Sequence, residues 1–176
     1  MNNHNALKNI LNQVKIFGDN HILPINEDLN LAGFAFIDNF SFEKGAQFFT
    51  YLAEAVLNNC DFGFIDKKIG QDDILSLCNA TLNADVFIFL FLHNPNPNDN
   101  LDDLIATFNN IIKPLSQNKP TISLIFNSQI PPEQIESNTI LTFSNDSLES
   151  IAASILFLSK ENPLEIVELD ELSYRN

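Results

Sequence analysis

Basic residues are scarce in this chain of 176 residues. Lysine and arginine number 9 together, against 23 aspartates and glutamates, which gives a formal net charge of −14. Because an acidic protein repels a phosphate backbone, we expect no nucleic-acid binding. Two interpretations of the acidic charge are open: it keeps the protein soluble, or it forms a face that binds a basic partner. The charges are spread along the chain, which favours the first interpretation.

Cysteines and long apolar runs are also scarce. No apolar run approaches the roughly 20 residues that span a bilayer. The start, "MNNHNALKNILNQVK", has no apolar signal-peptide core. We therefore expect a cytoplasmic protein with no membrane insertion. The two cysteines, Cys60 and Cys78, form no CxxC pair and lie apart from the histidines in sequence, which predicts buried free thiols and no metal site.

Glycine-rich ligand motifs are missing. The turn "DNFSFEKG" places Phe40 and Phe42 where a dinucleotide-binding fold needs small residues. The chain contains neither a GxxxxGK[ST] phosphate loop nor a GxSxG nucleophile elbow. We expect no cofactor, and no motif supplies a set of catalytic residues.

Apolar strand patterns alternate regularly with amphipathic helix patterns. The predicted strands are 31–38, 61–66, 85–92, 120–126 and 139–143, with a last edge strand at 164–169. The predicted helices are 6–15, 41–59, 71–82, 100–115 and 147–160, with a short helical turn at 131–137. This alternation is typical of an α/β protein: a three-layer, Rossmann-like, doubly wound and mainly parallel sheet of about five strands. The run "VFIFLFL" predicts a central strand, covered on both faces.

The domain organisation follows from the same pattern. Residues 1–27 are predicted to form an N-terminal helix and a loop, and residues 28–176 a single Rossmann-like domain. Capping side chains mark three helix starts. They are Ser41, then Asn98 or Asn100, then Asp146 with Glu149 as a capping box.

Polar residues gather where the predicted strands end. In open parallel sheets, ligands bind just beyond the carboxyl ends of the strands. The candidate ligand-binding residues there are Asp38, Asn39, Asp66, His93, Asn94, Asn127, Ser128 and Ser144. The alternative is that they are ordinary turn residues. As a general base, His93 would need a positioned partner, which the sequence does not identify.

The segment 34–66 resembles the molybdopterin-oxidoreductase-like domain of the large subunit of NADH-quinone oxidoreductase. That pattern has a strand, then S-x-E opening a helix, then N-N-x-D before the next strand. The matching residues are Ser41, Glu43, Leu52, Ala53, Asn58, Asn59 and Asp61. The cysteine clusters that hold iron–sulfur centres in that family are missing, so the resemblance implies a module without cofactors.

A second resemblance competes with the first. The segment from "GFAFID" to "NADVFIFLFL" is also similar to the ligase-type domain of acyl-CoA synthetases of the succinyl-CoA ligase kind. Residues 69–71 fit a turn of that family, but its phosphohistidine motif G-H-x-G is absent. The resemblance therefore does not imply its catalysis.

These observations lead to two functional hypotheses. The first is a non-catalytic accessory module that binds a protein partner, or a second copy of itself, in association with a respiratory oxidoreductase complex. The alternative is a nucleotide-binding or CoA-binding domain, or an enzyme, with its site at the carboxyl edge of the sheet.

Overall fold

The computed structural model describes residues 3–26, 28–38, 41–56, 60–92, 99–116, 119–126 and 129–160. The strands are β1 (Lys15–Gly18), β2 (Leu31–Phe36), β3 (Cys60–Ile65), β4 (Val86–Phe91), β5 (Thr121–Ile125) and β6 (Thr139–Thr142). The helices are α1 (Asn3–Leu11), α2 (Phe42–Val56), α3 (Gln71–Ala80), α4 (Leu101–Ser116) and α5 (Leu148–Ser159), with a 3₁₀ turn η1 (Pro132–Gln134). The predicted edge strand at 164–169 lies outside the described residues.

The strands form one six-stranded sheet in the order β1-β6-β5-β4-β2-β3. β2 to β6 are parallel to one another, and β1 alone runs antiparallel, against β6. β4 pairs with both β2 and β5, and all six of its residues are buried. The predictions of an α/β doubly wound sheet and of a central strand at 86–92 are confirmed.

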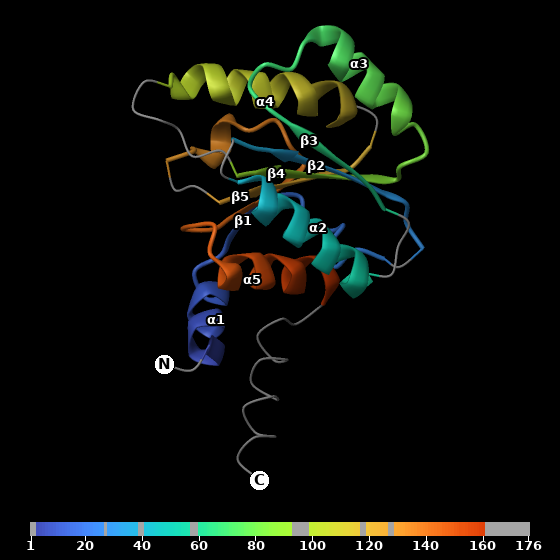
Figure 1. Ribbon diagram of the computed structural model, residues 1–176. Helices are drawn as coiled ribbons and strands as arrows, with labels where there is room; N and C mark the ends of the chain where they lie inside the picture. Colours follow the sequence, from blue (N-terminus) through green and yellow to red (C-terminus); the bar gives the residue numbers. More distant parts are fainter. Residues whose placement is uncertain are drawn as a thin grey trace.

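Helices cover both faces of the sheet, which gives three layers. In Figure 1, α3 and α4 lie above the sheet and α1, α2 and α5 lie below it. The crossover connections explain this arrangement, because each helix that joins two parallel strands must pack across one face.

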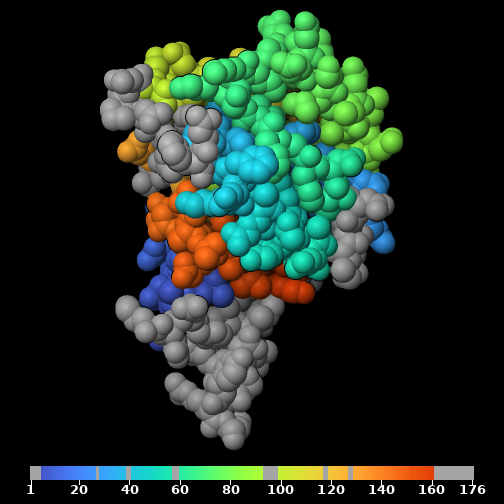
Figure 2. All heavy atoms as spheres, in the orientation of Figure 1, coloured from blue at the N-terminus to red at the C-terminus, as the bar shows by residue number. Residues whose placement is uncertain are grey.

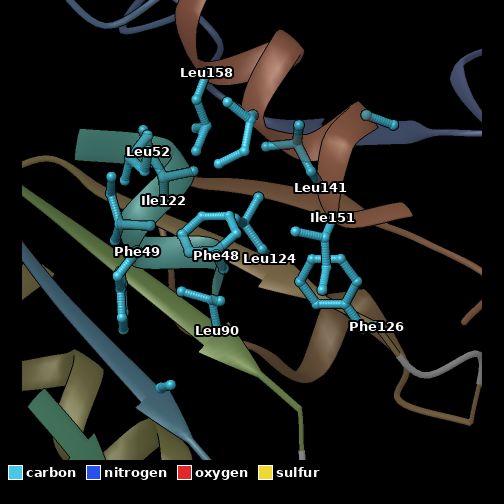
Figure 3. Packing of buried hydrophobic residues seen from close by; sticks show 14 of the residues in the cluster. Phe48, Phe49, Leu52, Leu90, Ile122, Leu124, Phe126, Leu141, Ile151 and Leu158 are labelled. Atoms are coloured by element: carbon cyan, nitrogen blue, oxygen red, sulfur yellow. The ribbon is translucent and has the colours of Figure 1, made fainter. Parts of the chain in front are cut away.

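Alternate side chains of each strand enter opposite cores. On the α2 and α5 face, the central residues include Phe48, Leu90, Leu124 and Leu141 (Figure 3). On the α3 and α4 face, the core is built mainly from aromatic and branched side chains. It includes Phe36, Phe87, Phe89, Phe91, Phe108 and Ile112. The strands therefore read as continuous apolar runs because neither of their faces meets water.

The amino-terminal segment differs from the expectation of a helix over 6–15 followed by a loop. The helix ends at Leu11, and Lys15–Gly18 forms β1 at the edge of the sheet. Gly18 has φ +80, and a Cβ there would lie 2.2 Å from the backbone oxygen of Asn138. Only glycine fits this close crossing. The division of the chain at residue 27 stays a prediction.

Two of the expected helix caps differ from the sequence prediction in detail. At α5, Ser147 rather than Asp146 is the cap, and its hydroxyl oxygen accepts a hydrogen bond from the Ser150 amide. At α4, the Asn100 side chain accepts from the Asp102 amide at 3.1 Å, as predicted. Ser41 precedes α2 as expected, but its hydroxyl bonds to Asp38.

Candidate functional site

The carboxyl edge of the sheet holds the three predicted site residues that the structure describes: Asp38, Asp66 and Ser144. Asn39, His93, Asn94, Asn127 and Ser128 lie outside the described residues. Asp38 and Asp66 follow neighbouring strands, since β2 pairs in parallel with β3. Ser144 follows β6, which β5 and β4 separate from β2. The fold therefore brings the two aspartates to one end of this edge and leaves Ser144 toward the other.

Asp38 builds the turn into α2. Its Oδ1 accepts hydrogen bonds from the Ser41 amide and hydroxyl, both at 2.9 Å. The Asp38 amide in turn donates to the Ser41 hydroxyl oxygen at 2.9 Å. This reciprocal arrangement fixes the start of the helix. The described contacts of Asp38 are those of a turn residue, the alternative raised from the sequence.

Asp66 lines a cleft of about 410 Å³ at the carboxyl end of β3. Both polar and apolar residues line it. It is lined by Phe64, Ile65, Asp66, Lys68, Ile69, Asp73, Ser76 and Leu77. Its volume lies within the range of small-molecule sites.

The backbone holds both carboxylates of this cleft in place. Asp66 Oδ1 accepts from the Lys68 amide at 2.7 Å, and Asp73 Oδ2 accepts from the Gly70 amide at 3.1 Å. Each carboxylate thus uses one oxygen to shape the loop between β3 and α3. The sequence pattern alone does not show that Asp73, in the first turn of α3, lies in the same cleft as Asp66.

Ser144 lines a separate hollow of about 290 Å³ next to β1. Its neighbours there include Lys15, Phe17 and Thr142. The Ser144 side chain is exposed. Asp66 and Ser144, predicted as members of one set, thus line two different hollows.

Two ion pairs join loops along this edge. Lys44 of α2 meets Asp146 before α5 at 2.6 Å, and Lys67 meets Asp99 before α4 at 2.6 Å. Lys67 thus reaches a carboxylate whose side chain is only 12% exposed. Partly exposed pairs of this kind contribute about 0–1 kcal/mol each. Their role is to fix the loops around the carboxyl edge.

The opposite, amino edge also has a hollow, of about 420 Å³, but several of its polar groups already bond within the protein. Lys119 Nζ donates to the carbonyl oxygens of Leu82 and Ala84. The Asn138 side-chain oxygen accepts from the Thr121 amide and hydroxyl at 2.8 and 2.9 Å. These bonds anchor the strand starts, so fewer groups are available to a ligand here.

The two cysteines are half-buried rather than fully buried. Burial, followed by the nearby Asp61 carboxylate, raises the pKa of the Cys60 thiol to about 11. Burial also raises the pKa of the Cys78 thiol. Both are therefore protonated and poorly nucleophilic at neutral pH. Among the described residues, no group of three or more His, Cys, Asp or Glu side chains could hold a metal ion. In the same residues, no helix is long and apolar enough to cross a membrane.

No family model and no curated protein matches the sequence. Solved structures do match the fold. A glycoside hydrolase family 3 β-N-acetylglucosaminidase from Paenibacillus sp. str. FPU-7 has a TM-score of 0.64 and 7% identity, over 87% of this chain and 29% of that one. The β-glucoside phosphorylase BglX has a TM-score of 0.53 and 11% identity, over 90% of this chain and 28% of that one. Zn-bound CbsA from Thermotoga neapolitana has a TM-score of 0.53 and 10% identity, over 93% of this chain and 30% of that one.

These neighbours overturn the predictions of family and of function. The chain resembles domains of glycoside hydrolase type in fold, so both predicted resemblances, to NADH-quinone oxidoreductase and to succinyl-CoA ligase, are wrong. The predicted accessory module of a respiratory complex, and its nucleotide or CoA alternative, are replaced for the same reason. Both errors have one cause: an alternation of strands and helices is shared by many unrelated α/β families. The chain spans less than a third of the length of these structures.

Proposed function

We propose that this chain is an α/β domain of a carbohydrate-active protein and that it binds a saccharide in the cleft at the end of β3. The observation that carries the proposal is the composition of that cleft. Asp66, Lys68, Asp73 and Ser76 offer charged and polar groups there. Ile65, Ile69 and Leu77 offer aliphatic side chains.

A sugar ring combines the same two kinds of group. Its hydroxyl groups pair with carboxylates, ammonium groups and hydroxyls, and its C–H faces pack on apolar surfaces. The cleft lies at the carboxyl edge of a parallel sheet, where α/β proteins commonly bind ligands. The fold neighbours described as β-N-acetylglucosaminidase and β-glucoside phosphorylase support the choice of saccharide over other small molecules.

Thermal unfolding with added N-acetylglucosamine, glucose and short β-linked glucosides tests the proposal. A saccharide that binds the folded state raises the unfolding midpoint in proportion to its affinity. Lys68→Ala and Asp66→Asn should each weaken binding by about tenfold, because each removes a charged hydrogen-bonding group. The Asn side chain can still accept from the Lys68 amide, so the loop should keep its shape.

Asp72→Asn is the matched control. Asp72 is an exposed carboxylate in the same first turn of α3 but does not line the cleft. The control should bind the saccharide as the wild type does. No midpoint shift with any of these sugars, or an equal loss in the control, would contradict the proposal.

We further propose a reducing compartment, the cytoplasm, because Cys60 and Cys78 are both free. Thiol titration of the protein isolated without reductant should count both as reduced. An oxidised thiol in that sample would argue for a different compartment.

A further inference from the structure

The outer edge of β3 has backbone groups that no other strand of the described sheet pairs with. β3 is the last strand in the order and pairs only with β2. The Ile37 amide donates to the Ile65 oxygen, so Ile65 directs its backbone groups toward β2. Because backbone direction alternates along a strand, Phe62 and Phe64 direct their N–H and C=O groups outward.

The same two residues expose aromatic rings on the α2 side of this edge. Phe62 is 36% exposed and Phe64 is 37% exposed. Phe62 stacks on Phe49 with centroids 4.3 Å apart, and Phe64 meets Phe42 at 4.4 Å. The Phe49 ring also packs directly on the backbone of Gly33 in β2, because a Cβ on Gly33 would lie 2.4 Å from this ring. In Figure 2, α2, β3 and α3, in cyan to green, form much of the face turned toward the viewer.

Edge strands of soluble proteins are usually protected by lysine, proline or a bulge. β1, at the other edge of the sheet, follows this rule: it has four residues and begins with Lys15. β3 has six residues, "CDFGFI", with neither lysine nor proline. Its only charge is Asp61, near one end. An apolar edge of this kind is a template for another strand.

We infer that two copies of this chain associate through β3, antiparallel, about a two-fold axis at Gly63. In this register Phe62 lies opposite Phe64 of the second copy, and the reverse pair follows by symmetry. Both residues have outward backbone groups, so each such pair makes two hydrogen bonds. The four rings then meet on one face, where aromatic cross-strand pairs stabilise a sheet.

The charges at the two ends of β3 complement each other in this arrangement. Asp61 lies near its amino end, and Lys67 and Lys68 follow its carboxyl end. Antiparallel pairing brings the acidic end of each strand beside the basic end of the other. Asp61 lies opposite Ile65 of the second copy. Lys67 of that copy is held by its own Asp99 at 2.6 Å, so the exposed Lys68 is the ammonium group available to Asp61. A second copy is therefore a better partner for this edge than the net charge of −14 suggests.

Sedimentation of the full chain over a wide range of concentrations tests the inference. The wild type should be a dimer that dissociates on dilution. Phe62→Lys should be monomeric, because an ammonium group would face the partner's ring across the edge. Phe17→Lys is the matched control: Phe17 is 38% exposed on the edge strand β1, and this variant should dimerise normally.

Asp61→Lys supplies a second variant that spares the aromatic stack. It places like charges at two symmetric positions and should weaken the dimer on the order of tenfold. Circular dichroism confirms that each variant is folded. A wild type that stays monomeric, or a folded Phe62→Lys protein that dimerises as strongly as Phe17→Lys, would overturn the inference. Phe64 belongs to both proposed sites, but Phe62 and Asp61 do not line the saccharide cleft, so variants at these two positions test the dimer separately from saccharide binding.

Discussion

β4 and β3 are two six-residue strands of similar composition with opposite surroundings. β4, "VFIFLF", is buried at every position, whereas three of the six residues of β3, "CDFGFI", are exposed. The difference comes from their places in the sheet. β4 has a strand on each side, and β3 has one. The number of neighbouring strands, rather than the number of phenylalanines, thus decides how much of a strand is buried.

The helices that follow these strands differ in the same way. α4 buries six side chains, among them Leu104 and Phe108, and α3 has none in the fully buried class. α4 packs over the middle of the sheet, whereas α3 follows the edge strand and packs more loosely against the same core. The centre of the sheet therefore supplies stability, and its β3 edge leaves side chains exposed. Two substitution pairs and one pH measurement test this division.

The largest effect is expected in β4. Phe89 is 1% exposed, and Phe89→Asp would bury a carboxylate without a partner at a cost of several kcal/mol. Against a total stability of about 5–15 kcal/mol, the variant should be unfolded or nearly so. Phe62→Asp in β3 loses its stacking on Phe49 but keeps its charge in water. It should fold, with a loss of about 1–2 kcal/mol. Urea unfolding followed by circular dichroism measures both, and a normally folded Phe89→Asp protein would refute the central place of β4.

An intermediate effect is expected between the helices. Leu104 in α4 is 4% exposed, so Leu104→Ala should cost about 2–5 kcal/mol through lost burial and the cavity left behind. Leu75 in α3 is 62% exposed, and Leu75→Ala should change stability by no more than about 0.5 kcal/mol. Equal losses in the two unfolding curves would show that α3 contributes to the core as much as α4 does.

The smallest effect concerns pH and the half-buried Cys60 in β3. Its pKa is raised from 9.0 to about 11, so the unfolded chain loses the thiol proton at lower pH than the folded chain does. The stability associated with this thiol is therefore complete below pH 9.0 and falls as the pH rises toward about 11. Urea midpoints measured across this interval should fall less steeply for Cys60→Ser. Identical slopes in the two proteins would mean that the thiol is as accessible folded as unfolded.

Much of the fold could be predicted because local patterns report burial directly. The uninterrupted apolar run before residue 93 predicts a strand with both faces covered, and this is where β4 lies. Helix starts at Ser41 and Asn100 could be predicted from side chains that bond to nearby backbone groups. The β1 strand could not, since "KIFG" is short and becomes a strand only by pairing with β6, far along the chain.

The candidate site was predicted only in part. Strand ends are visible in the sequence, so Asp66 could be named, but its partners in the cleft depend on how α3 is positioned against β3. The position of Ser144 could not be predicted either. The order of strands in the sheet determines which strand ends lie close together, and no local sequence pattern reports that order. The sequence by itself determined which segments are buried strands and amphipathic helices, through periodicity and capping. Only the tertiary structure decided that β3 lies at the edge, that Asp66 and Asp73 share a cleft, and that Ser144 lies apart from them, because these depend on long-range pairing of backbone groups.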